Sequence, residues 1–177
     1  KMELYVNMAD INFDNKLGED ETVALIELMF FAYRDFVSDP DTVLEQLGFG
    51  RAHHRVVHFV GRDPGMTVAQ LLDILRITKQ SLGRVLKDLI DKGYVFQKEG
   101  ETDRRQRLLH LTAAGEELRQ SLMAPQVSRI RRAVSETSDN GRTSMRDMLY
   151  HLVSPENRDG VKEWIDGAGK PGAKPGE

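Results

Sequence analysis

Apolar residues recur every three to four positions along most of the chain, which is the spacing of amphipathic helices. The longest regular stretch lies at 19–37 and carries Ile26, Met29, Phe30, Tyr33 and Val37. Three acidic residues at 19–21 precede these positions, and acidic side chains favour the N-terminal end of a helix. The segment 38–41 contains Pro40 and should end the helix, because the residue before a proline disfavours the helical conformation.

The same spacing predicts a series of shorter helices in the middle of the chain, at about 42–47, 51–62, 68–75 and 79–92. Thr67 and Thr78 directly precede the last two helices, and a threonine hydroxyl at an N-cap accepts from a backbone N–H of the first turn. Gly93 stands where a left-handed C-cap is expected. Because the linker between the last two helices is so short, they form a helix-turn-helix candidate.

After Gly93 the pattern changes to that of β-strands. Residues 94–98 and 107–111 contain the aromatic and branched side chains that strands favour, with turn-forming residues at 100–103 between them. Two helices followed by strand, basic loop and strand make up the order of a winged helix-turn-helix, here with a two-stranded wing. The predicted fold class is therefore mainly α with a small β-wing.

The rest of the chain is again helical. Thr112 should cap a long helix that starts near Ala113, and Pro125 should kink or interrupt that helix, because proline lacks the N–H of the helical hydrogen bond. We expect two further helices at about 143–152 and 156–165.

Charge is unevenly distributed along this chain of 177 residues with a net charge of −3. Residues 1–49 carry three basic and eleven acidic side chains, whereas residues 76–107 carry nine basic and five acidic ones. A basic segment of this kind can attract phosphates although the whole chain is negative. The total charge therefore does not argue against a nucleic-acid partner.

Several classes of function are excluded or lack support. The chain has no cysteine, so thiolate zinc sites, iron–sulfur clusters, thiol catalysis and disulfide scaffolds are excluded. No apolar run approaches the ~18 residues that span a bilayer, and no signal-peptide pattern is present, so we expect a soluble cytoplasmic protein without a membrane partner. No catalytic constellation stands out, and we expect neither enzymatic activity nor a cofactor.

Three local motifs together resemble the MarR family of winged-helix transcription regulators. They are Leu86-x-x-Leu89-Ile90-Asp91-Lys92-Gly93-Tyr94-Val95, then Asp103-Arg104-Arg105, then Leu111-Thr112-Ala113-Ala114-Gly115. The resemblance is specific over about 67–118 and extends over 20–166 by element order and length. Many members carry an extra Asp-x-Arg at the start of the wing, where this chain has Gly100-Glu101-Thr102, so a second wing arginine is missing.

The resemblance implies a homodimeric regulator, usually a repressor, that binds a palindromic operator and has an effector pocket between the dimerisation helices and the DNA-binding lobe. By their composition, residues 1–18 are an arm or a disordered segment and residues 167–177 a flexible tail. Between them, the resemblance implies dimerisation and pocket helices (19–50), a DNA-binding winged helix-turn-helix (51–112) and a long helix with C-terminal dimerisation helices (113–166).

The candidate DNA-binding residues lie on the second helix of the helix-turn-helix and on the wing. The N-terminal residues of such a helix face base edges in the major groove. Arginines at a wing tip suit a narrow, electronegative minor groove, whereas Arg107 suits either a phosphate or support of the wing. The full set is Thr78, Lys79, Gln80, Ser81, Arg84, Lys87, Arg104, Arg105 and Arg107.

Five residues are candidates for lining an effector pocket: Phe30, Tyr33, His54, His58 and Phe59. His54 and His58 are four residues apart and share a helix face, as two zinc ligands would. The H-E-x-x-H pattern is absent, and we predict no metal site. Two alternative functions remain open from the residues alone: a winged-helix module that binds a partner protein, and a histidine-based metal-sensing regulator.

Overall fold

The computed structural model describes residues 18–100, 103, 105–138 and 140–167. The chain separates into two compact units that divide between Phe36 and Val37, and each unit is described by itself. The first unit contributes nearly all of α1 (Glu19–Ser38), which confirms the predicted long helix. Apolar side chains of α1 remain exposed in this structure, with Phe30 69% and Tyr33 65% accessible.

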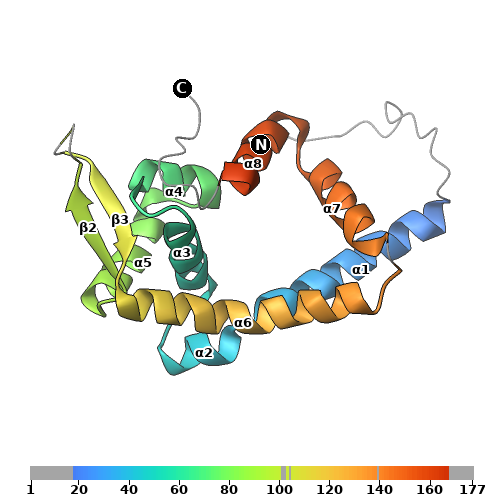
Figure 1. Cartoon of the computed structure of the whole chain (residues 1–177), viewed down its shortest axis with the longest axis horizontal. Helices are drawn as coiled ribbons and strands as arrows, with labels where there is room; N and C mark the ends of the chain where they lie inside the picture. The colour runs from blue at the N-terminus through green and yellow to red at the C-terminus, as the bar shows by residue number, and fades with distance from the viewer. Residues whose placement is uncertain (1–17, 101–102, 104, 139, 168–177) are drawn as a thin grey trace, which may run out of the picture. The chain divides into compact units, whose positions relative to one another are not determined.

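The second unit holds all other elements (Figure 1). In chain order they are α2 (Asp41–Gln46), α3 (Arg51–Arg62), β1 (Met66–Thr67), α4 (Val68–Leu75), α5 (Lys79–Asp91), β2 (Val95–Glu99), β3 (Arg107–Leu111), α6 (Ala113–Ser135), α7 (Gly141–Leu152), η2 (Pro155–Asn157) and α8 (Arg158–Gly167). The order helix, helix, strand, strand that defines a winged helix-turn-helix is therefore present from α4 to β3.

Threonine caps fix the starts of α4, α5 and α6, as the sequence predicts. The hydroxyls of Thr67, Thr78 and Thr112 each accept the backbone N–H three residues further on. At the other end of α5, Gly93 has a φ of +76°, a conformation that glycine adopts without steric cost. These local signals explain why the predicted starts of α4, α5 and α6 agree with the structure.

The sheet is antiparallel with the strand order β1-β3-β2, so the prediction of a two-stranded wing is incomplete. Strand β1 pairs Met66 with Leu109 and Thr67 with Leu108. A strand of two residues is too short to show an alternating pattern, and it is therefore not predictable from periodicity. Figure 1 shows β2 and β3 as a hairpin that leads directly into the start of α6.

The core of the second unit lies between α3, α4, α5 and the inner face of the sheet. The stripe predicted for α5 is buried and consists of Leu82, Val85, Leu86 and Leu89. It meets fully buried residues such as Val56 and Leu71 from the neighbouring helices. Since one face of α5 is used in this way, its opposite face points to solvent.

Helix α6 continues through Pro125, so the alternative that the proline interrupts this helix is wrong, whereas a kink stays a prediction. Proline at this position removes one backbone hydrogen bond, to the carbonyl of Ser121. Leu122 and Gln126, which come before and after the proline in the chain, are both buried, and their packing supports the helix on either side of it.

The C-terminal helices α7 and α8 start close to their predicted positions. Trp164 of α8 packs against Phe59 of α3, with ring centroids 5.7 Å apart. Within the described part of the chain, no helix is both long and apolar enough to span a membrane.

Candidate nucleic-acid interface

The solvent face of α5 gathers polar and cationic side chains over its first two and a half turns. Lys79, Gln80, Arg84 and Lys87 are all exposed there, opposite the buried stripe. Gly83 lies among them, and a Cβ built on it has no atom within 4 Å. The middle of this face is therefore open, bordered by side chains that can donate hydrogen bonds.

Thr78 and Ser81, which are also predicted to contact DNA, are engaged with each other at the helix start. The Thr78 hydroxyl accepts the Ser81 N–H at 3.1 Å and donates to the Ser81 hydroxyl at 2.9 Å. Both residues remain exposed. Their first role in the free protein is to define where α5 begins.

Lys87 forms an ion pair with Asp91, one turn further along α5. The hydrogen bond to the carboxylate raises the pKa of the Lys87 ammonium above its usual value. Any contact that Lys87 makes with a phosphate therefore competes with Asp91.

The wing carries Arg105 in its turn and Arg107 at the start of β3, next to that turn. Arg105 is exposed, and its backbone N–H donates to Asp103 Oδ1 at 2.9 Å, which closes the turn. Arg107 pairs with Glu99 directly across the strands at 2.9 Å, so it supports the wing. Arg104 lies outside the described residues.

A glycine and a threonine at the junction of β3 and α6 hold the wing onto the helices. The Thr112 hydroxyl donates to the Gly93 carbonyl at 2.6 Å, and the Thr112 N–H donates to the Tyr94 carbonyl at 3.1 Å. A Cβ on Gly115 would lie 2.0 Å from that same Tyr94 oxygen. This close approach gives a physical reason for the Leu-Thr-x-x-Gly pattern in the sequence.

His54 and His58 both face the interior of the second unit from α3. Burial lowers the pKa of His54, and burial lowers the pKa of His58 to about 4, with further contributions from His54, Arg119 and Arg62. His58 Nδ1 is buried and has no hydrogen-bond partner among the described residues. Within the same part of the chain, no cluster of three histidine, aspartate or glutamate side chains is suited to a metal ion.

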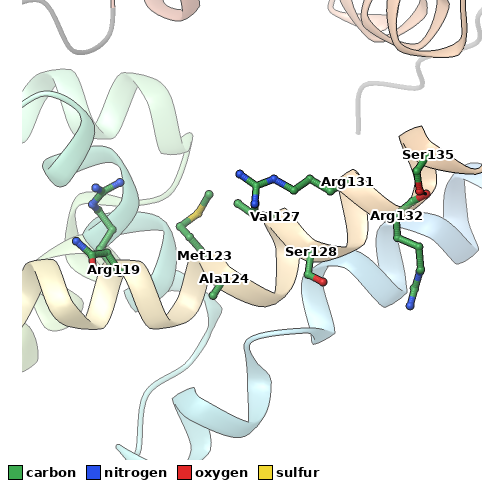
Figure 2. Close-up of a pocket in the computed structure, with 9 residues that line it drawn as sticks. Arg119, Met123, Ala124, Val127, Ser128, Arg131, Arg132 and Ser135 are labelled. Atoms are coloured by element: carbon green, nitrogen blue, oxygen red, sulfur yellow. Dashed lines mark hydrogen bonds between the residues drawn. The ribbon is translucent and has the colours of Figure 1, made fainter. Parts of the chain in front are cut away.

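A pocket of about 870 Å³ lies along α6 (Figure 2). Its lining residues are Arg119, Gln120, Met123, Ala124, Val127, Ser128, Arg131, Arg132 and Ser135. As far as the described residues show, none of the five predicted effector residues belongs to this lining. Phe30 and Tyr33 lie on α1, whereas His54, His58 and Phe59 lie on α3, and their joint role in a pocket stays a prediction.

Comparison with known proteins identifies relatives over most of the chain. Residues 47–106 match the model of the MarR family. The HTH-type transcriptional regulator PetP from Rhodobacter capsulatus is 46% identical over 133 residues, which cover 75% of this chain and 80% of PetP.

Solved structures share the fold at lower identity. FabT from Streptococcus pneumoniae, solved in complex with DNA, is 20% identical with a TM-score of 0.61, over 74% of this chain and 94% of FabT. A putative MarR family regulator from Listeria monocytogenes, solved with a 26mer DNA, is 17% identical with a TM-score of 0.64, over 82% of this chain and 96% of the other. The fold, the matched segment and the similarity to PetP agree, and the chain belongs to the MarR family of transcriptional regulators.

Proposed function

We propose that this regulator binds double-stranded DNA in a sequence-specific way through α5 and the wing. The observation that carries the proposal is the exposed polar and cationic face of α5, opposite its buried stripe and on the same unit as Arg105. Helix α5 would enter the major groove, as the second helix of a helix-turn-helix does. The relatives solved with DNA support the same assignment.

Each predicted contact residue has a role in this complex. Gln80 and Arg84 contact base edges: a glutamine can pair with adenine and an arginine with guanine, and each bidentate pair discriminates by ~1–3 kcal/mol against the wrong base. Lys79, Ser81, Thr78 and Lys87 contact neighbouring base edges or phosphates. Arg104 and Arg105 enter the minor groove, while Arg107 holds the wing or contacts a phosphate.

The functional form is a homodimer on a palindromic operator. Support comes from apolar side chains that are exposed in the single chain, among them Leu28 (63%) on α1 and Leu152 (58%) on α7. Exposed apolar surface of this kind commonly marks a protein interface. Two recognition helices related by a two-fold axis would read half-sites about 10 bp apart.

The dimer represses transcription by occupying a promoter, and a small-molecule effector changes its affinity for that site. Affinity for the operator depends on both recognition helices docking together. An effector that binds more tightly when the two DNA-binding lobes of the dimer have one particular spacing therefore changes the fraction of operator that is occupied. Phe30, Tyr33, His54, His58 and Phe59 are the proposed contacts of this effector. The proposal places the protein in the cytoplasm with the DNA that it regulates.

DNA selection from a random library, followed by fluorescence anisotropy on the selected duplex, tests the proposal. We expect a palindromic consensus, and affinity that falls steeply as salt rises, because phosphate contacts release counterions. Arg105→Ala should weaken binding to all duplexes, whereas Gln80→Ala should relax the preference at one base pair. Lys162→Ala changes an exposed cation of α8 and is the matched control, with unchanged affinity.

Two results would contradict the proposal: affinity that does not depend on salt, or equal affinity for the selected palindrome and for random duplex. The first result would favour the alternative of a module that binds a partner protein. DNA binding that requires zinc and is lost in His54→Ala/His58→Ala would favour the metal-sensing alternative.

A further inference from the structure

A cluster of rings and charges holds the C-terminal end of α5 against the connection between α2 and α3. At its centre is Phe49, which is only 7% exposed. The ring of Phe49 stacks on the imidazole of His53 with centroids 4.5 Å apart, and meets the edge of Tyr94 at 5.6 Å. On α5's side, the Lys92 ammonium lies 4.2 Å from the centre of the Phe49 ring.

His53 uses both of its ring nitrogens in this cluster. Nδ1 accepts the N–H of Gly50 at 3.1 Å, so the neutral ring carries its proton on Nε2. Nε2 lies 3.4 Å from Asp88 Oδ2 on α5 and is placed to donate to it. The imidazole therefore joins the N-terminal cap of α3 to the last turns of α5.

Lys92 makes a second directional link between the same two segments. Its ammonium donates to the backbone carbonyl of Leu47, in the connection that also carries Phe49. Together, Asp88 and Lys92 attach the end of α5 to residues 47–53 by contacts that require defined angles.

These directional contacts add to the apolar support that α5 receives from its buried stripe. The buried stripe fixes the axis of α5 and limits its rotation, because dispersion contacts are small one by one but large together. Hydrogen bonds add a dependence on angle that dispersion contacts lack, and so refine the rotation of α5 about its axis. A rotation of about 20° would move side-chain ends, about 5–6 Å from the axis, by about 2 Å. That displacement is enough to break a bidentate contact between Gln80 or Arg84 and a base.

We propose that His53 is a positioning residue for sequence recognition: by joining Gly50 to Asp88 it sets the rotation of α5 about its axis, and so the alignment of Gln80 and Arg84 with base edges. The inference rests on the proposed DNA binding through α5. His53 meets α5 at Asp88, one turn after Arg84 and two turns after Gln80.

The capping role and the positioning role of His53 can be separated by substitution. Glutamine is the residue type that commonly makes the hydrogen bond to an N-cap N–H from this position, so His53→Gln keeps the cap of α3 while it loses the stack and the link to Asp88. His53→Ala loses both roles. Asp88→Asn keeps an oxygen that accepts from Nε2, whereas Asp88→Ala removes it.

The experiment measures affinity of the full chain for the selected palindrome and for random duplex, with thermal unfolding of each variant. We expect His53→Gln to unfold close to the wild-type temperature, to bind the palindrome about three- to tenfold more weakly and to keep its affinity for random duplex. Asp88→Asn should retain most of the preference for the palindrome. In a double-mutant cycle, the effects of His53→Gln and Asp88→Ala on affinity for the palindrome should be non-additive. The cycle also cancels the effect that losing the Asp88 charge has on affinity by itself.

Two outcomes would overturn the inference: unchanged preference for the palindrome in His53→Gln, or additive effects of the two substitutions. They can be told apart from failure of the proposed function, because in that case the wild-type chain itself shows no preference for any duplex.

Discussion

Arg129 of α6 holds the carboxylate of Asp39, ninety residues earlier in the chain, with two parallel hydrogen bonds of 2.6 and 2.7 Å. The Asp39 side chain is 14% exposed and that of Arg129 33%. We predict that Arg129→Ala lowers the free energy of unfolding by about 1–3 kcal/mol, because a mostly buried carboxylate loses its partner.

Urea denaturation at several pH values checks this prediction. The hydrogen bond from Arg129 lowers the pKa of Asp39 below 3.8, so the stabilisation is complete above that pH and is lost as pH falls through the lower pKa of the folded state. Arg131→Ala is the matched control, since Arg131 is an exposed arginine of the same helix, and it should change stability by less than about 0.5 kcal/mol. Equal effects of the two substitutions would contradict the prediction.

A methyl group at Gly115 should disrupt the junction between the wing and α6. The Cβ would lie 2.0 Å from the Tyr94 carbonyl oxygen, which belongs to the backbone and cannot rotate away. We expect Gly115→Ala to destabilise the protein by more than about 2 kcal/mol, at the upper end of overpacking effects. Calorimetry should show a change in stability of the opposite sign, a stabilisation, for Gly160→Ala in α8, where the Cβ meets nothing within 4 Å. Similar melting temperatures for both variants would rule out the close approach.

The sequence predicts those parts of this fold that local chemistry determines. Each threonine cap lies where a hydroxyl precedes a periodic apolar run, and the starts of α4, α5 and α6 follow from these caps. Strand β1 was missed because its two residues are defined by pairing with β3 and not by their own pattern. The sequence also predicts that Pro125 kinks or interrupts α6; the helix is not interrupted, and buried Leu122 and Gln126 flank the proline.

Within the candidate site, the sequence predicts which α5 side chains are exposed, because burial of the opposite stripe follows from periodicity. Contacts between distant segments are not predictable in this way. The Asp39–Arg129 pair and the link from His53 to Asp88 join residues 90 and 35 positions apart. No local pattern indicates either contact, because each depends on how the helices pack.

Acid should destabilise the protein through His58. Burial lowers its pKa from 6.5 to about 4 in the folded state, so between these values the unfolded chain binds a proton that the folded chain does not. The contribution of the neutral imidazole is therefore complete above pH 6.5 and is lost as pH falls towards 4. We expect a loss of about 1–3 kcal/mol over this range, allowing for the partial exposure of the ring.

Chemical denaturation of wild type and His58→Phe between pH 7.5 and 4 measures this effect. The variant should show a shallower dependence of stability on pH, with a residual slope from His54, whose pKa burial also lowers. An identical slope in both proteins would show that His58 does not titrate differently on folding.

Gly83 tests the proposed DNA-facing surface through opposite effects on stability and binding. A Cβ at this position meets no atom within 4 Å, so Gly83→Ala should raise the free energy of unfolding by about 0.5–1 kcal/mol, the helix-propensity difference between alanine and glycine. The same methyl group would stand beside Gln80 and Lys87, which are three residues before and four residues after it on the exposed face of α5. It should weaken binding to the selected palindrome about tenfold and leave affinity for random duplex nearly unchanged, because phosphate contacts tolerate a small displacement of the helix.

Thermal unfolding and anisotropy titrations on the same preparation measure both the stability and the DNA affinity of Gly83→Ala. A variant that is more stable and binds the palindrome as tightly as wild type would show that α5 does not approach DNA with this face.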